Sequence, residues 1–137
     1  MELASKKVNV QASDTAIFNM LINCNNIGKY IPNDKVKDWQ STENSCSFSV
    51  EGAGRVEMSI QEKTPCSFVA YSIGNQLTKG ALICFSINRL NGQENVCELE
   101  AKTSLDVPFF MAKMLESTLQ KFIDMLIDYI KIAAEKT

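Results

Sequence analysis

The chain has 137 residues, 45% of them hydrophobic and 22% charged, which is the size and composition of one globular domain over residues 1–137. Its net charge is −2 and it contains no basic cluster, which argues against a nucleic-acid partner. No N-terminal apolar run has the form of a signal peptide and no stretch approaches about 18 apolar residues, so we expect a cytoplasmic protein without membrane insertion.

The first part of the chain predicts a strand followed by two short helices. Alternating valines favour a strand over Leu3–Val10. Ser13 or Asp14 is a good helix N-cap, and apolar residues at helical spacing predict a helix over Thr15–Asn23. The following pair of asparagines breaks this pattern. A second short helix is expected over Ile27–Tyr30, ending before the next proline because the residue preceding proline is pushed out of the helical region.

After residue 35 the hydrophobic period changes to two, which predicts a series of strands. The expected strands are Val36–Thr42, Ser45–Val50, Arg55–Gln61, Ser67–Ile73, Ala81–Leu90 and Val96–Leu105. Turn residues separate them at Gly52-Ala53-Gly54, Thr64-Pro65, Gly74-Asn75 and Asn91-Gly92. The last of these pairs is the strongest hairpin signal in the chain.

The final segment, from Pro108 to Thr137, has the pattern of one long helix. At 100° per residue its polar side chains gather in an arc of roughly 100°. They are Lys113, Ser117, Gln120, Lys121, Asp124, Asp128, Lys131 and Glu135. The apolar arc is roughly 220° wide, about twice what a surface helix needs. The helix is therefore held deeply in a curved sheet, lines a ligand cavity, or is covered by a second subunit, and the sequence leaves a homodimer open.

Several of these features together resemble a known superfamily. They are Ile31-Pro32 closing the second short helix, Trp39 in the next strand, the segment Cys46–Val50, the Gly52/Gly54 turn and the terminal helix beginning near Pro108. With them the whole chain resembles the helix-grip superfamily of START, Bet v 1 and polyketide cyclase-like domains (SRPBCC). Within it, the chain is most similar to small bacterial members, those like polyketide cyclases and those like a small component of carbon monoxide dehydrogenase.

The resemblance implies an α+β helix-grip fold. A curved antiparallel sheet of about seven strands would wrap around a long C-terminal helix, with two short helices after the first strand and an apolar cavity between sheet and helix. Members of the superfamily bind lipids, sterols, polyketides or other hydrophobic small molecules, and a minority are enzymes. The resemblance transfers no catalytic set to this chain.

The sequence offers little reactive chemistry of its own. It has no histidine, which removes the commonest general base and metal ligand, and we predict no catalytic residue, metal or cofactor. The five cysteines show no CxxC spacing, and we expect them to be free thiols, mostly buried. They are Cys24, Cys46, Cys66, Cys84 and Cys97.

Candidate ligand contacts follow from the alternation and from the apolar arc of the helix. Phe48 and Met58 lie on the strand faces that should turn inward. The predicted cavity-wall residues are Trp39, Phe48, Met58, Tyr71, Phe85, Leu115, Leu119 and Phe122. Residues of this kind are more often ordinary hydrophobic core than ligand contacts.

Three functions follow. The first is non-catalytic binding of a hydrophobic small molecule or lipid in a cavity between sheet and C-terminal helix. The alternative is a protein-interaction or assembly factor that uses the wide apolar helix face. The third is a cyclase, dehydratase or hydrolase. A cavity of several hundred Å³ would favour binding, and a filled core with an exposed apolar patch would favour interaction.

Overall fold

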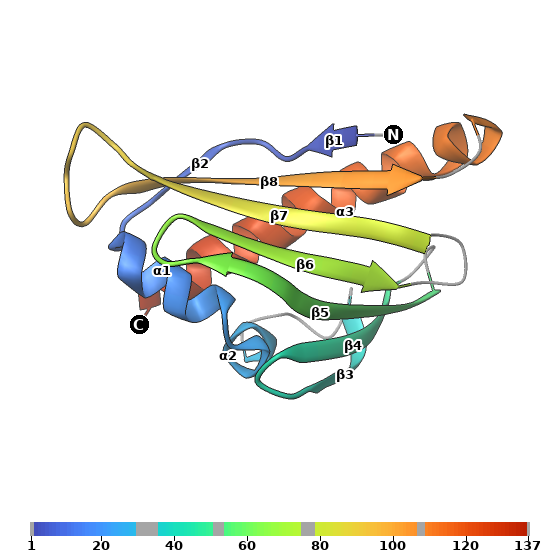
Figure 1. Ribbon diagram of the computed structural model, residues 1–137, viewed down its shortest axis with the longest axis horizontal. Coiled ribbons are helices and arrows are strands. Elements are labelled where there is room, and N and C mark those ends of the chain that lie inside the picture. The colour runs from blue at the N-terminus through green and yellow to red at the C-terminus, as the bar shows by residue number, and fades with distance from the viewer. Residues whose placement is uncertain (1, 30–35, 51–53, 75–78, 107–108, 137) are drawn as a thin grey trace.

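The computed structural model describes residues 2–29, 36–50, 54–74, 79–106 and 109–136. Its elements in chain order are β1 (Glu2–Ala4), β2 (Val8–Val10), α1 (Asp14–Leu21), α2 (Cys24–Gly28), β3 (Val36–Ser41), β4 (Ser45–Val50), β5 (Gly54–Thr64), β6 (Phe68–Gly74), β7 (Lys79–Arg89), β8 (Cys97–Asp106) and α3 (Phe109–Lys136). The strands form one antiparallel sheet in the order β1-β8-β7-β6-β5-β4-β3, and β2 also pairs with β8. Helix α3 crosses one face of this sheet, and α1 and α2 lie near its C-terminal end (Figure 1). This arrangement confirms the expected α+β helix-grip fold.

The first strand is not continuous as predicted, because it is interrupted between β1 and β2. Leu3 pairs with Thr103 and Val8 pairs with Leu99, so the register against β8 shifts by one residue between them. The buried Ser5 causes the shift. Its Oγ accepts a hydrogen bond from the N–H of Ala101 at 2.9 Å, and its own N–H donates to the Ala101 carbonyl at 2.7 Å. The Ser5 hydroxyl thus replaces a backbone carbonyl as the acceptor of one hydrogen bond of the ladder. The one extra residue of the first strand bulges out of the pairing.

The two short helices begin where side-chain caps allow. Of the two predicted caps, Ser13 is the one that caps α1, with its Oγ accepting from the N–H of Ala16 at 3.1 Å. The expected break at the paired asparagines was wrong. Asn23 caps α2 by accepting from the N–H of Asn25 at 3.1 Å, so α2 begins at Cys24 and contains both asparagines. The predicted end near Tyr30 lies outside the described residues.

The hairpin signal at Asn91-Gly92 marks a turn, but not a two-residue hairpin loop. Both residues have positive φ, 52° and 71°, as a turn of this kind requires. The connection between β7 and β8 nevertheless spans residues 90–96, because the N–H of Leu90 donates to the Val96 carbonyl at 3.1 Å and closes a wider loop. Of the other predicted turns, residues 52, 53 and 75 lie outside the described part of the chain.

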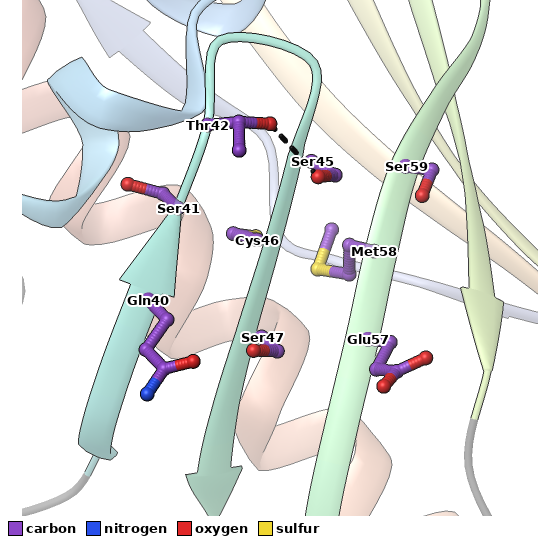
Figure 2. A pocket seen from close by; sticks show the side chains of 9 residues that line it. All are labelled: Gln40, Ser41, Thr42, Ser45, Cys46, Ser47, Glu57, Met58 and Ser59. Atoms are coloured by element: carbon purple, nitrogen blue, oxygen red, sulfur yellow. Dashed lines mark hydrogen bonds between the residues drawn. The ribbon is translucent and has the colours of Figure 1, made fainter.

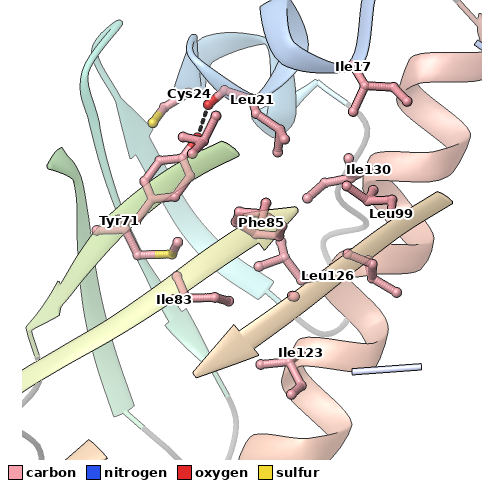
Figure 3. Packing of buried hydrophobic residues seen from close by; sticks show 14 of the residues in the cluster. Ile17, Leu21, Cys24, Tyr71, Ile83, Phe85, Leu99, Ile123, Leu126 and Ile130 are labelled. Carbon is pink, nitrogen blue, oxygen red and sulfur yellow. Dashed lines mark hydrogen bonds between the residues drawn. The ribbon is translucent and has the colours of Figure 1, made fainter. Parts of the chain in front are cut away.

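The hydrophobic core lies between the sheet and the C-terminal two thirds of α3 (Figure 3). The sheet contributes alternate residues of its inner face, including Tyr71, Phe85 and Leu99, each at most 1% exposed. The helix contributes the buried side chains Phe122, Ile123, Leu126, Ile127, Ile130, Ala133 and Ala134. The five cysteines are free, and Cys24, Cys46 and Cys97 are buried in or beside this core.

A row of polar side chains on α3 binds the backbone of the edge segment formed by residues 4–11. The contacts are Gln120 Nε2 to the Ala4 carbonyl at 2.9 Å, the Lys6 N–H to Asp124 Oδ1 at 2.9 Å, Lys6 Nζ to Asp128 Oδ2 at 2.8 Å, Lys131 Nζ to the Asn9 carbonyl at 2.9 Å, and the Gln11 N–H to Glu135 Oε2 at 2.9 Å. The helix thus supplies donors and acceptors where the sheet has no further strand, which closes this edge against pairing with another chain.

We expect Phe122→Ala to lower the free energy of unfolding by about 3–5 kcal/mol, because it empties a buried aromatic site. Phe122 is 9% exposed and stacks on Phe48 with ring centroids 5.8 Å apart. Urea denaturation would measure the loss. Phe110→Ala is the matched control, since Phe110 is in the same helix but 68% exposed, and it should change stability by no more than about 0.5 kcal/mol. Equal losses in the two variants would contradict the placement of α3.

Two carboxylates give the stability a pH dependence of defined sign. A hydrogen bond from Arg89 holds the pKa of Asp14 below its ordinary value of 3.8, and one from Lys131 holds the pKa of Glu135 below 4.5. A lowered pKa in the folded state contributes stability above the ordinary value, and this is lost as the pH falls through the lowered value. We expect the urea midpoint of the wild type to approach that of Asp14→Asn between about pH 5 and pH 2. A gap between them that stays constant over this range would contradict the assignment.

Candidate functional site

A small enclosed cavity lies between the sheet and α3. Its volume is about 10 Å³, and it is lined by Ile27, Trp39, Cys46, Phe48, Met58, Tyr71, Phe85, Leu126 and Ile130. A space of this size holds one water molecule at most. The aromatic rings that were expected to surround a roomy cavity fill it instead, so in this conformation the interior is closed.

The structure brings most of the predicted wall residues to this cavity. Trp39, Phe48, Met58, Tyr71 and Phe85 all line it, and they come from the five neighbouring strands β3 to β7. Of the other three predicted residues, which lie on α3, Phe122 and Leu119 do not line it. Phe122 contacts it only through Phe48, Leu119 is half-buried nearer the start of the helix, and the side chain of Leu115 lies outside the described part.

Four lining residues were missed. They are Ile27, Cys46, Leu126 and Ile130. A signal existed for three of them: Cys46 alternates in phase with Phe48, and Leu126 and Ile130 belong to the apolar arc of the helix. Ile27 carries no such signal, because its position depends on where α2 begins.

An aromatic stack runs from the protein surface into the core at this site. Trp39 is half-buried and stacks on the buried Phe48, with ring centroids 5.1 Å apart and an interplanar angle of 13°. Phe48 in turn stacks on Phe122 of α3. A bulge places Trp39 here: the register of β3 against β4 shifts between Lys37 and Gln40, where Asp38 has φ 56°. Trp39 is therefore the outermost layer between the cavity and the solvent.

The indole N–H of Trp39 is buried and has no hydrogen-bond partner among the described residues. It lies against Gly28 at the end of α2, so closely that a Cβ on Gly28 would stand 2.1 Å from Nε1. Leaving a buried donor unsatisfied costs about 1–3 kcal/mol relative to its hydrated state. The closed position of Trp39 is therefore held by stacking and by close packing on a glycine, against an unfavourable polar term.

The polar groups that border the cavity are uncharged. The Tyr71 hydroxyl donates to the carbonyl of Leu21 at the end of α1 (Figure 3), and burial raises the pKa of Tyr71 well above its ordinary value. A hydrogen bond with Cys24, together with burial, raises the pKa of Cys46. Both groups stay protonated at neutral pH. The described lining contains no carboxylate, amine or guanidinium, so this site is suited to neutral, apolar molecules.

A second hollow lies on the polar side of β3, β4 and β5, with a volume of about 460 Å³ (Figure 2). Hydroxyl groups dominate its lining. Thr42 Oγ1 and Ser45 Oγ are 2.9 Å apart, and the Ser41 hydroxyl donates to Asn25 Oδ1 of α2 at 2.5 Å. The hollow is open to solvent and apolar walls are few. Small-molecule sites are usually enclosed and mostly apolar, and this hollow is neither. Among the residues that the structure describes, no cluster of His, Cys, Asp or Glu could hold a metal ion.

Comparison with known proteins gives the fold. No protein-family model matches the sequence, and neither does any curated protein. Solved structures do match. Norcoclaurine synthase of Thalictrum flavum, a point mutant in complex with a transition-state analogue, has a TM-score of 0.77 at 10% identity, covering 99% of this chain and 94% of that one. A START superfamily protein of Mycobacterium smegmatis has a TM-score of 0.71 at 15% identity, covering 98% and 97%.

A further structure, the Aha1 dimer of Colwellia psychrerythraea, has a TM-score of 0.65 at 17% identity and covers 98% of this chain and 96% of that one. The chain thus has the START/Bet v 1 (SRPBCC) helix-grip fold, as the sequence predicted. The narrower likeness to small bacterial members, including the carbon monoxide dehydrogenase component, stays a prediction. No helix among the described residues is long and apolar enough to cross a membrane.

We expect Gly28→Ala to displace Trp39 from the cavity wall, because the added methyl would occupy the place of the indole nitrogen. Such overpacking costs about 1–3 kcal/mol, and the emission maximum of Trp39 should shift to longer wavelength as the ring becomes hydrated. Gly74→Ala is the control, since a Cβ there meets nothing within 4 Å. If both variants keep the stability and emission of the wild type, the contact between Gly28 and Trp39 is not as described.

Proposed function

We propose that this helix-grip protein binds a hydrophobic small molecule or lipid between its sheet and α3, without transforming it. The proposal rests on the uncharged, mostly aromatic wall around the small enclosed cavity. Five strands contribute to this wall, through Trp39, Phe48, Met58, Tyr71 and Phe85. Burial of an apolar ligand there would contribute about 25 cal/mol per Å² of apolar surface removed from water. Tyr71, whose hydroxyl is already bonded to Leu21, supports binding rather than acid–base chemistry.

The closed cavity must widen to admit a ligand, and Trp39 is the side chain that would move. It is half-buried, it forms the outer layer of the aromatic stack, and no hydrogen bond from the described residues anchors its ring. Rotation outward would break the stacking on Phe48 but would let the indole N–H bond water or a ligand acceptor. These two changes partly offset each other, so the open form lies closer in free energy to the closed one than burial alone suggests. The measured affinity would include the cost of opening.

Trp39 is also the single tryptophan of the chain, so intrinsic fluorescence reports directly on this site. We expect the uncharged probe N-phenyl-1-naphthylamine to bind the native protein saturably, with a rise in probe emission and a change in the Trp39 emission maximum. A linear, non-saturating response of both signals at all probe concentrations would overturn the proposal.

Two matched substitutions locate the binding site. Cys46→Leu adds bulk to the cavity lining, whereas Cys97→Leu makes the same change at a buried position of β8 that does not line it. Both should cost about 1–3 kcal/mol of stability. Only Cys46→Leu should weaken probe binding, by about tenfold or more, which is ~1.4 kcal/mol. If Cys46→Leu does not fold, Met58→Phe replaces it, because a rigid ring at that position also obstructs the cavity. Equal affinity in all folded variants would show that the probe binds elsewhere.

A further inference from the structure

The outward face of α3 carries apolar side chains that the core leaves partly or largely exposed. Phe110 is 68% exposed, Met114 77% and Ile132 40%. Tyr129 is half-buried, as is Met125, which packs against the core with part of its side chain. A shallow groove of about 670 Å³ runs over this face, and Met125, Tyr129 and Ile132 are its apolar lining. The apolar arc of about 220° predicted from the sequence is thus wider than the sheet requires, and its surplus faces solvent.

These side chains lie along one stripe of the helix, which also contains Thr118 and Lys121. At 100° per residue, Met114, Lys121, Met125 and Ile132 fall within about 40° of one another. Thr118 and Tyr129 flank them on the same side. The spacings along the stripe are those of a seam between two packed helices. They are four, three, four and seven residues, between the successive positions Met114, Thr118, Lys121, Met125 and Ile132. From Met114 to Ile132 the stripe is about 27 Å long.

The charges within and beside the stripe indicate what would cover it. Lys121 is exposed and has no ion-pair partner among the described residues, and Asp128 is still 44% exposed although one of its oxygens binds Lys6. An antiparallel pairing of two α3 helices centred on Met125 sets Lys121 of each copy beside Asp128 of the other. A parallel pairing would set Lys121 against Lys121 and Asp128 against Asp128, which is repulsive.

The same antiparallel register matches the apolar groups. Met125 meets its own copy on the two-fold axis, Ile132 lies opposite Thr118, and the aliphatic stem of Lys121 covers the ring of Tyr129. The acidic side chains beside the stripe, Asp124 and Asp128, make an anionic membrane surface a poor alternative.

We infer that a second copy of this chain docks on the outward stripe of α3 to form an antiparallel, two-fold symmetric dimer, held by Met125 and Ile132 and oriented by reciprocal Lys121–Asp128 pairs. This surface is on the opposite side of α3 from the proposed ligand site. Dimerisation and ligand binding can therefore be tested, and can fail, independently.

Sedimentation equilibrium over a range of concentrations tests the dimer. The wild type should reach twice the 15.3 kDa mass of one chain. Ile132→Glu and Met114→Glu alter exposed positions, so they should fold normally and raise the dissociation constant at least about tenfold. A wild type that stays monomeric at the highest concentration, or dimers unaffected by both substitutions, would overturn the inference.

A charge exchange tests the orientation. Lys121→Glu and Asp128→Lys each place like charges at both reciprocal contacts, so each variant alone should be a weaker dimer. A mixture of the two variants restores opposite charges at both contacts. The introduced carboxylate would face the introduced amine, and the native Lys121 of one copy would face the native Asp128 of the other. The mixed dimer should therefore regain wild-type affinity.

Lys63→Glu, an exposed charge reversal on β5, is the control for the charge exchange and should change nothing. Weakening by either variant that mixing does not repair would rule out this register, as would a mixture no stronger than its components.

Discussion

The contact between the polar row of α3 and the edge segment of residues 4–11 determines how the rest of the molecule is arranged. Gln120, Asp124 and Glu135 reach backbone groups of the edge segment at 2.9 Å, and Lys131 does so from the same row. Because these positions recur every three or four residues, the row fixes the rotation of α3 about its own axis. One side of the helix must then face the sheet, and the opposite side must face solvent. The proposed ligand site and the proposed docking stripe both depend on this one constraint.

The interior shows how a fold associated with cavities can be closed by its own side chains. Aromatic rings from β3, β4, β6 and β7 meet with little room between them, and the remaining space is about 10 Å³. The packing around Trp39 is not favourable in every respect. Its indole N–H is buried and has no hydrogen-bond partner among the described residues. The indole also lies so close to Gly28 that a larger residue there would clash with it. The unsatisfied donor lowers the cost of an arrangement in which Trp39 moves outward, because its indole N–H could then bond water.

The sequence predicted what depends on periodicity and missed what depends on single polar contacts. Alternation assigned the strand faces correctly, so Phe48 and Met58 could be placed in the interior. The width of the apolar arc indicated that α3 has more apolar surface than the sheet covers. Nothing in the pattern indicated that the Ser5 hydroxyl would interrupt the first strand, or that a bulge at Asp38 would orient Trp39. Such features arise from one hydrogen bond or one dihedral angle, which leaves no periodic trace.

The pairing of the edge segment with α3 also sets the order in which the chain can fold. Lys6 and Asp124 are 118 residues apart, and Gln11 and Glu135 are 124 apart, so the edge segment makes these contacts only after α3 has docked. Until then a nascent chain has both an unpaired sheet edge and an uncovered apolar face. Contacts of such long sequence separation form late, since the loop between them must first be ordered. A chain in which α3 has not yet docked therefore leaves both the edge segment and the inner face of the sheet uncovered, and surfaces of this kind favour aggregation.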